Sequence, residues 1–461
     1  MSKRRYVDCA KSELDLFEPY PLDLMNEEGY WSYYSAKNLD LNQNEITIDI
    51  PGSSYYIDLS SCMLFVKARI SKQGEDKITT DSKIAPVNNF LHSCFKQISI
   101  DLNGTTIENT NITYPYKAYL LNLLNYNNEA KDTFLSSSLF YKDTPSQMDN
   151  IEMVRVKTEG TGNNTKEVPV TVNEGMMQRR KLLIDGEGKI EMMGPLYCDL
   201  FHSDRFLMDN IPIRIKLWKS DDKFCLMGPK DSTYTVSFEE VKIRIRHQLV
   251  SPRVMVAHKH TLQKTNAIYP IKSSVVKIFP IINNTLNVSQ IISDSFVPDK
   301  VIIAMTDGLS TTGLFDKNPF NFKHFFLEEC YLRIDNHEKP YLNRIKLNFQ
   351  QNMYLDGYMT LFDALNNHNV GNNISRTDWP NGFPIFAFNL QPISTCNGEY
   401  LSSKKKSLLT VDLQFAQKSL DTYGKSDISL IVFFEFCTQI EIDKDLKIHK
   451  LENEPLTTTV V

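Results

Sequence analysis

The feature of this sequence that most constrains its fold is a strand, a tight turn and a short helix that occur twice, about 234 residues apart in a chain of 461. In the first copy, apolar residues alternate with polar ones from Ile98 to Leu102, Asn103-Gly104 supplies the positive φ angles of a hairpin turn, and apolar residues then keep helical spacing. That helical spacing is seen at Tyr116, Tyr119, Leu120, Leu123 and Leu124. The second copy has Leu332, Ile334 and Asp335, a turn at Asn336-His337, and helical spacing at Tyr358, Leu361, Phe362 and Leu365. The simplest account is a duplicated all-β domain with unequal insertions.

Composition and length favour a particular all-β fold. The 26 Phe and 21 Tyr, against 3 Trp, favour pleated and half-buried surfaces, and 461 residues suit two domains of about 200 residues each. Eight short strands with long crossing connections fit a jelly roll, in which two sheets face each other, although other sandwiches fit the same pattern. We therefore predict an all-β double jelly roll, two fused eight-stranded β-sandwiches with short accessory helices.

Domain boundaries follow from the first and last strand patterns of each half. The first convincing alternation starts at Glu45, and Ser251-Pro252 interrupts the strand pattern, which resumes at Ile268. A polar segment rich in Gly, Asn and charge lies between Asp143 and Met193. The predicted domains are an N-terminal arm (1–44), a first jelly roll (45–255) with a long surface loop at about 143–193, a second jelly roll (256–450) and a C-terminal tail (451–461).

Charge and cysteine usage exclude several classes of protein. A formal net charge of −5 gives no global basic field for binding nucleic acid. The 8 Cys are scattered singly, without the close pairs of a zinc site or redox motif, and are expected to be reduced core thiols. The first 16 residues lack the apolar run of a signal peptide, and no stretch approaches the roughly 20 apolar residues of a membrane span. We expect the protein to be made and used on the cytosolic or nuclear side.

No catalytic, cofactor-binding or metal site is predicted from the residues that could suggest one. Gly186-Glu-Gly188-Lys189 lacks the spacing and the following helix of a phosphate loop. His258 and His260 have no Cys or carboxylate at ligand spacing nearby, so surface histidines are favoured over a metal pair. Asp101 and Asp335 occupy equivalent places beside turns in separate halves, which favours turn residues over an acid and base pair.

Two further clusters leave an alternative open. Lys404-Lys405-Lys406 is expected to be a solvated charge run, with contact to nucleic-acid phosphates as the alternative. Phe320, Phe322, Phe325 and Phe326 form the densest aromatic cluster, for which core packing is favoured and a subunit interface is the alternative.

Several segments, in the same order along the chain, carry a family resemblance. They are Gly194-Pro-Leu-Tyr-Cys-Asp-Leu-Phe201, Ile211–Lys219, Val254–Ile271, Lys317–His324, and Gly371-Asn372 through Trp379-Pro380-Asn381-Gly382 to Ala387-Phe388. Together they span most of the chain from about Pro86 to Asp443, and in them the sequence resembles the major capsid protein of Polinton (Maverick) elements and adintoviruses. The segment Asp143–Met193 and the Asn-rich loop of the second half show no such resemblance.

The resemblance implies a structural protein, not an enzyme. It implies that three copies form a pseudo-hexameric capsomer of an icosahedral double-stranded DNA virus or virus-like element, akin to adenovirus hexon and virophage capsid proteins. The expected partners are the chain itself, a single jelly-roll penton protein, minor capsid proteins and, at most weakly, genome DNA, with no cofactor and no small-molecule substrate. The expected location is the virion, assembled in the host cytoplasm or nucleus. The alternative is a carbohydrate-binding or carbohydrate-cleaving protein on a tandem jelly-roll scaffold.

Overall fold

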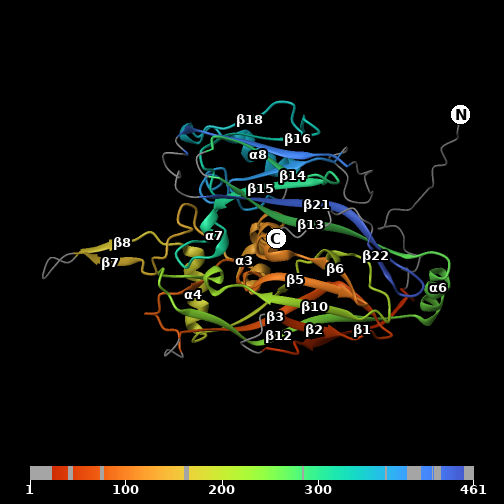
Figure 1. Ribbon diagram of the computed structural model, residues 1–461. Coiled ribbons are helices and arrows are strands. Elements are labelled where there is room, and N and C mark those ends of the chain that lie inside the picture. Colours follow the sequence, from red (N-terminus) through yellow and green to blue (C-terminus); the bar gives the residue numbers. More distant parts are fainter. Residues whose placement is uncertain are drawn as a thin grey trace, which may run out of the picture.

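The computed structural model describes residues 23–39, 45–72, 77–159, 166–282, 285–368, 371–391, 406–417, 419 and 427–450. Within them the chain forms two antiparallel β-sandwiches, one stacked on the other (Figure 1). We refer to these as the first half and the second half.

The first half consists of two 4-stranded antiparallel sheets, ordered β1-β12-β3-β9 and β2-β10-β5-β6. The bounds of these strands are β1 Asn26–Ser35, β2 Glu45–Ile50, β3 Tyr56–Lys72, β5 Phe95–Leu102, β6 Thr105–Asn109, β9 Lys189–Pro195, β10 Ile213–Lys219 and β12 Tyr234–Val250. In β2, β5 and β10 the isoleucines alternate toward the interior, because successive side chains of a strand point to opposite faces.

The second half has two sheets of the same design, β13-β21-β15-β19 with β22 beside β21, and β14-β20-β16-β17 with β18 beside β16. The bounds are β13 Ala267–Ile281, β14 Asn287–Ser293, β15 Lys300–Asp307, β16 Leu327–Ile334, β17 His337–Lys339, β18 Ile345–Lys346, β19 Ile385–Asn389, β20 Leu409–Phe415, β21 Ile428–Ile442 and β22 Ile448–Lys450. Since each sheet corresponds strand by strand to one in the first half, the predicted duplication and the double jelly roll are confirmed.

Helices and short ladders connect the strands. The helices are α1 Phe90–Ser93, α2 Tyr114–Asn125, α3 Asn128–Asp132, α4 Glu174–Asp185, α5 Asp222–Cys225, α6 Pro252–Leu262, α7 Gly308–Thr312 and α8 Leu355–Leu365. The 3-10 helices are η1 Asn111–Thr113, η2 Phe134–Ser138, η3 Asp199–His202 and η4 Phe349–Gln351. The short ladders pair β4 Ala85–Pro86 with β11 Leu226–Met227, and β7 Val156–Glu159 with β8 Lys166–Pro169. The helices α2 and α8 confirm the two predicted helical patterns.

The two hairpin turns use the same backbone conformation. Asn103 and Gly104 have φ of 46° and 80°, as a two-residue turn between right-twisted strands requires. In the second half the positive φ angles belong to Asp335 (48°) and Asn336 (67°), because β17 already begins at His337. The predicted turn at Asn336-His337 is therefore shifted by one residue.

The structure corrects the expectation that the first strand begins at Glu45. β1 lies within the segment 1–44 that was predicted to be an arm, and it pairs antiparallel with β12 at the edge of its sheet. Its residues from Asn26 to Trp31 are all exposed, as is Tyr33, so the strand lacks the clear alternation that identifies a half-buried strand. Residues 1–22 and 40–44 lie outside the described residues, as does the predicted tail 451–461.

The segment 143–193 differs from the predicted surface loop in its second part. It contains the β7-β8 hairpin, the helix α4 and most of strand β9, and residues 160–165 lie outside the described residues. The helix α4 starts at an Asn173 cap and buries Met176, Arg179 and Leu183. A buried arginine on that face obscured the apolar spacing of the helix. The junction after Ser251 is likewise a helix, α6, with Pro252 in its first turn.

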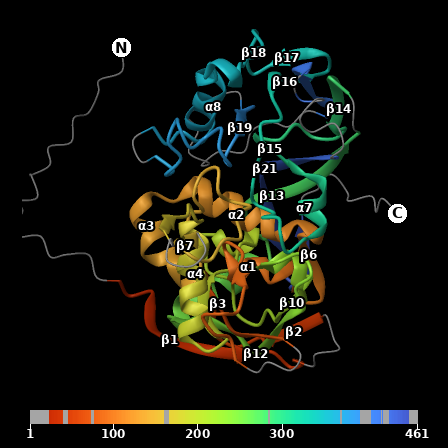
Figure 2. The same cartoon turned by 90° about the vertical axis from the view of Figure 1, so that its left-hand side faces the viewer.

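The four sheets lie in a fixed order. In Figures 1 and 2 the sheet β14-β20-β16-β17 is farthest from the first half, followed by β13-β21-β15-β19, then β2-β10-β5-β6, and β1-β12-β3-β9 on the opposite side. Each hydrophobic core includes residues of the other half: Tyr269 and Ile271 join the first core, while Tyr119 and Leu120 of α2 join the second. The two halves are thus packed into one body.

Candidate functional site

An aromatic cluster lies where α2 of the first half meets the second half. The rings of Tyr119 and Phe320 are stacked, with centroids 4.1 Å apart, and Tyr116 meets Phe320 edge to face at 5.8 Å. Phe320, Phe322 and Phe325 are buried, while Phe326 is half-buried. The phenylalanine cluster found in the sequence therefore packs inside the chain, at the contact between its halves, and fixes their relative position.

Three buried charged residues form a second part of this contact. The Lys117 Nζ atom lies 2.6 Å from Glu108 Oε1 and 2.7 Å from Asp199 Oδ1, and all three side chains are less than a tenth exposed. Asp199 in turn accepts hydrogen bonds from the Ser273 hydroxyl (3.0 Å) and the Ser274 hydroxyl (2.9 Å) of β13 in the second half. A buried charge is tolerated only with such partners, so this network requires the two halves to be docked.

Two members of this cluster, Glu108 and Lys117, have a raised pKa. Burial, followed by the neighbouring Asp199 carboxylate, raises the pKa of Glu108 to about 7. Burial alone would lower the pKa of Lys117, but Asp199 and Glu108 outweigh it, and that pKa is raised. The lysine therefore stays charged at all ordinary pH values.

A second buried ion pair connects the long insertion of the first half to the second half. Arg179 and Asp143 are fully buried, with 2.7 Å between Nη2 and Oδ1. The other carboxylate oxygen of Asp143 accepts a hydrogen bond from Asn318 Nδ2 at 3.0 Å, and Asn173 Nδ2 donates to Oδ1 at 3.0 Å. The start of the predicted surface loop is thus part of the interior.

Two lysines of the first half bind carbonyls of a loop of the second half. Lys131 Nζ donates to the carbonyl oxygens of Leu123 (2.6 Å) and Asn372, and Lys142 donates to Asn373 O and to Asp378 (2.7 Å). Burial, followed by the charge of Lys142, lowers the pKa of Lys131 to about 7. The predicted polar loop 366–382 is therefore held against the first half on one side.

The glycines and aspartates considered in the sequence occupy structural positions. Gly186 and Gly188 lie in the turn between α4 and β9, so a strand, not the helix of a phosphate loop, follows them. Asp101 accepts a hydrogen bond from Thr106 Oγ1 at 2.7 Å, across its hairpin, and Asp335 accepts one from the Leu408 amide at 3.0 Å. Asp101 thus bonds across its own hairpin and Asp335 bonds to the residue before β20, and the structure does not bring the two aspartates together into a site.

The histidines and lysines considered in the sequence contact separate neighbours. His258 Nδ1 is 2.9 Å from the Tyr56 hydroxyl, and His260 is exposed on the same helix, α6. Lys406 Nζ lies 5.4 Å from the centre of the Phe296 ring, whereas Lys404 and Lys405 lie outside the described residues.

No group of three or more His, Cys, Asp or Glu that could hold a metal ion occurs in the described part of the chain. Among those residues, no helix has the length and apolarity needed to cross a membrane.

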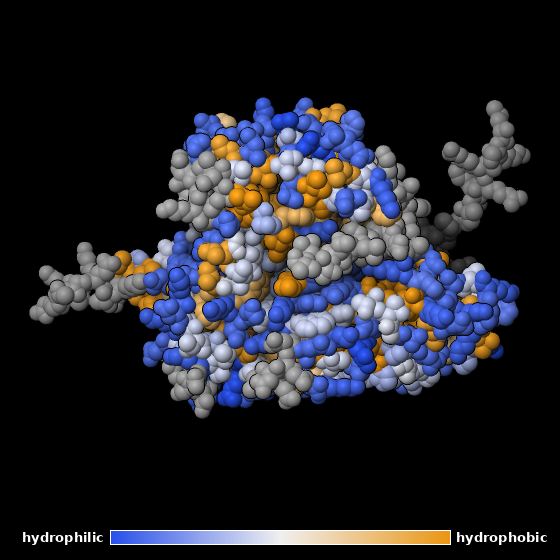
Figure 3. Space-filling view, in the orientation of Figure 1, coloured by the Kyte–Doolittle hydropathy of each residue, from blue (hydrophilic) through white to orange (hydrophobic). Residues whose placement is uncertain are grey.

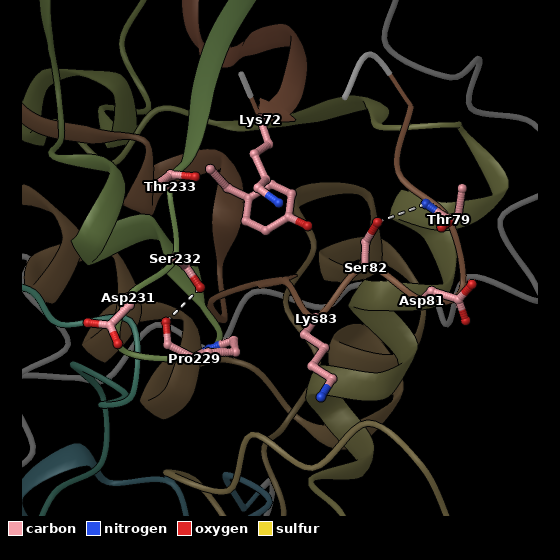
Figure 4. Close-up of a pocket in the computed structure, with 10 residues that line it drawn as sticks. Lys72, Thr79, Asp81, Ser82, Lys83, Pro229, Asp231, Ser232 and Thr233 are labelled. Atoms are coloured by element: carbon pink, nitrogen blue, oxygen red, sulfur yellow. Dashed lines mark hydrogen bonds between the residues drawn. The ribbon is translucent and has the colours of Figure 1, made fainter. Parts of the chain in front are cut away.

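An open pocket of about 490 Å³ lies at one end of the first half (Figure 4). Its walls include Lys72, Lys83 and Tyr234, and its hydroxyl groups bond within the wall: Thr79 N donates to Ser82 Oγ at 3.1 Å, and Ser232 Oγ donates to Pro229 O at 2.6 Å. A second pocket of about 560 Å³ adjoins it and shares residues 232–234. The wall of the first pocket includes Asp81 and Asp231, and that of the second includes Asp221 and Asp222, whose Oδ1 atom accepts a hydrogen bond from Lys219 Nζ at 2.8 Å.

The large exposed apolar side chains lie on the outer surface of the molecule and do not line either of these pockets. The view in Figure 3 shows apolar surface over the second half and along the junction, whereas much of the first half is hydrophilic. Sequence reasoning missed another exposed group, Trp31 and Tyr33 on β1, beside the cationic side chains of Lys242, Arg244 and Arg246 on β12. Exposed aromatics beside arginine are typical of protein interfaces.

Comparisons with known proteins agree with this architecture. No family model matches the sequence. An uncharacterized protein of Caenorhabditis elegans is 20% identical over 433 residues, which cover 90% of this chain and 92% of that protein.

Solved structures are similar over nearly the whole chain, at low sequence identity. A chain of the Sputnik virophage structure has a TM-score of 0.59 at 9% identity, with 99% of this chain and 97% of that chain covered. The Faustovirus major capsid protein has a TM-score of 0.54 at 10% identity, covering 95% and 93%, and the mavirus major capsid protein 0.50 at 11%, covering 100% of both. The chain therefore has the double jelly-roll fold, which it shares with these viral major capsid proteins.

Proposed function

We propose that this chain is the major capsid protein of an icosahedral double-stranded DNA virus or virus-like element. The observation that carries the proposal is the match over both jelly rolls, which covers 99% of this chain and 97% of the Sputnik chain. The side chains buried between the halves are structural, and the proposed role requires no catalysis, cofactor or small-molecule substrate.

The proposed building block is a homotrimer. Two similar jelly rolls per chain would give six similar units around a threefold axis, which is the geometry of a pseudo-hexameric capsomer. The buried hydrogen bonds of Asp199 with Ser274 and of Asp143 with Asn318 support this proposal, because they join the two jelly rolls of one chain.

The finer lineage we propose is that of Polinton (Maverick) elements and adintoviruses. It rests on the sequence segments between Pro86 and Asp443 described above. The similar protein in the nematode Caenorhabditis elegans also supports it, because an element integrated in animal genomes would leave such a gene there. The proposed partners are further copies of the chain, a penton protein, minor capsid proteins and, weakly, the genome. The proposed location is the virion, assembled in the host cytoplasm or nucleus.

The test is the assembly state of the purified full chain. Light scattering should give a stable species of about 160 kDa, three chains of 53.2 kDa each, and negative-stain images should show compact pseudo-hexagonal particles. A chain that stays monomeric at micromolar concentration would contradict the proposal. Specific retention on a glycan array by such a monomer would favour the carbohydrate-binding alternative.

A further inference from the structure

The two adjoining pockets at the end of the first half form one groove, because they share residues 232–234. Their volumes of about 490 and 560 Å³ lie in the range of pockets that bind small ligands. Figure 4 shows the turn 229–232 on one side of the first pocket and residues 79–82 on the other, with Lys72 and Lys83 between them. The second pocket extends to Thr312 on α7 of the second half. We call the two pockets together the end groove.

The walls of the end groove are held in place without a ligand. The amide and the hydroxyl of Ser232 both donate to the Pro229 carbonyl oxygen, at 3.0 and 2.6 Å. The Gly228 amide donates to the Phe315 carbonyl oxygen at 2.7 Å, which ties this turn to the second half. A Cβ atom at Gly228 would lie 2.6 Å from the Lys83 carbonyl oxygen, so the two walls pack directly on each other. A groove formed in advance saves the cost of ordering it on binding.

The charges that line the end groove cancel. Its lysines among the described residues are Lys72, Lys83, Lys219 and Lys223. Its aspartates there are Asp81, Asp221, Asp222 and Asp231. Most of the other lining residues are serine or threonine, whose hydroxyls both donate and accept hydrogen bonds. The groove therefore has many hydrogen-bonding groups but no net charge that would attract a polyanion or a polycation.

Several of these polar groups are available to a ligand. Lys83 and Asp231 are exposed, and neither side chain is paired with another described residue. Ser220 lines the second pocket and is only 3% exposed, yet its hydroxyl has no hydrogen-bond partner within the described part of the chain. A buried hydroxyl without a partner costs free energy, which a hydrogen-bonding group of a ligand recovers.

We infer that the end groove binds a neutral oligosaccharide. Sugar hydroxyls donate to carboxylates such as Asp231 and accept from ammonium groups such as Lys83, and these charge-assisted hydrogen bonds need no charge on the ligand. A peptide fits the groove less well, because peptide recognition uses apolar pockets or an open strand edge. The apolar rings in the groove, Tyr234 and Phe315, are only 8% and 3% exposed. The inference adds glycan binding to the proposed function and does not depend on trimer formation.

The experiment uses the full chain on an array of neutral, sialylated and sulfated glycans, and the neutral oligosaccharide retained most strongly is then titrated by calorimetry. Thr233→Trp fills the groove at an exposed position that both pockets share, and Lys83→Ala combined with Asp231→Ala removes the two unpaired charges. The matched control is Lys230→Ala combined with Asp185→Ala, an exposed lysine and aspartate outside the lining. We expect the first two variants to raise the dissociation constant at least about 10-fold. The control should bind as the unmodified chain does, and all variants should keep the same unfolding midpoint.

A second readout locates the ligand without relying on a loss of binding. The bound oligosaccharide should slow hydrogen–deuterium exchange in residues 79–83 and 229–235. Retention of no neutral glycan, unchanged binding by Thr233→Trp, or retention of only sialylated or sulfated glycans would overturn the inference and leave the proposed function intact. A chain that stays monomeric but binds the oligosaccharide through this groove would support the inference and contradict the proposed function.

Discussion

Asp199 of the first half accepts hydrogen bonds from both the backbone amide and the hydroxyl of Ser274 in the second half, at 3.1 and 2.9 Å. The same carboxylate lies 2.7 Å from the ammonium of the buried Lys117. One side chain therefore neutralises an internal charge and joins the two jelly rolls. Loss of this side chain should therefore affect both the burial of Lys117 and the contact between the two halves.

Replacing Asp199 by Ala should destabilise the protein by about 3 to 5 kcal/mol, because Lys117 would lose one of its two carboxylates and Ser274 its acceptor. Chemical denaturation followed by tryptophan fluorescence measures the change. The control is Glu187→Ala, which removes an exposed ion pair with Lys77 and should cost less than about 1 kcal/mol. Equal effects of the two substitutions would contradict the role assigned to Asp199.

The raised pKa of Glu108 predicts a pH-dependent contribution to stability. Its pKa is about 7 in the folded chain against 4.5 as the ordinary value, so the folded state binds more protons between these values. The stabilisation is fully present below about pH 4.5 and is lost as the pH rises through 7. Glu108→Gln should remove this dependence.

Histidines act in the opposite direction in part of the same window. Burial lowers the pKa of His92 to about 3 and that of His324 to about 4, which makes stability rise with pH up to about 6.5. The measurement is therefore the difference in unfolding free energy between the unmodified chain and Glu108→Gln. That difference should fall from pH 5 to pH 7.5, and a constant difference would contradict the prediction.

Phe320→Ala should cost about 3 to 5 kcal/mol, since it opens a cavity beside the stacked ring of Tyr119 at the contact between the halves. Calorimetry should also show broadened or split unfolding, because the two jelly rolls lose part of their shared core. Phe134→Ala is the control, since that ring is exposed on η2. A single sharp transition with an unchanged midpoint would show that the ring is dispensable.

The repeated pattern made the fold predictable because its residues report local geometry. Asn103-Gly104 specifies a turn through its own backbone preferences, and the alternation in β5 specifies which face is buried. Strand β1 could not be recognised in this way. Trp31 and Tyr33 face away from the core, and the partner strand β12 lies more than 200 residues away in sequence.

The buried network was missed for a related reason. Lys117 lies beside Tyr116 and Ala118 in a helix whose other residues are largely apolar, which is the one signal that could have marked it. Its partners Glu108 and Asp199 come from separate elements, so spacing along the chain does not bring them together. Arg179 similarly reads as a surface residue of a polar segment, and only the fold shows that it reaches Asp143.

The last prediction concerns the N-terminal segment, which carries Lys3, Arg4 and Arg5 in an otherwise net-acidic chain. Residues 1–18 show no sustained strand or helix pattern, and they precede β1, so we expect them to act in assembly instead of folding. Deleting residues 1–18 should leave the unfolding midpoint of the trimer nearly unchanged and reduce the yield of closed shells in an expression assay.

Deleting residues 1–35 is the matched comparison, since it also removes β1. The edge of β12 would then lose its partner from Lys242 to Val250, and the core would lose contact with Tyr34. We expect this longer deletion to lower the unfolding midpoint, because β12 loses its neighbouring strand and the core loses Tyr34. If deleting residues 1–18 unfolds the protein, those residues belong to the core. If it leaves shell assembly unchanged, the segment has no role in assembly.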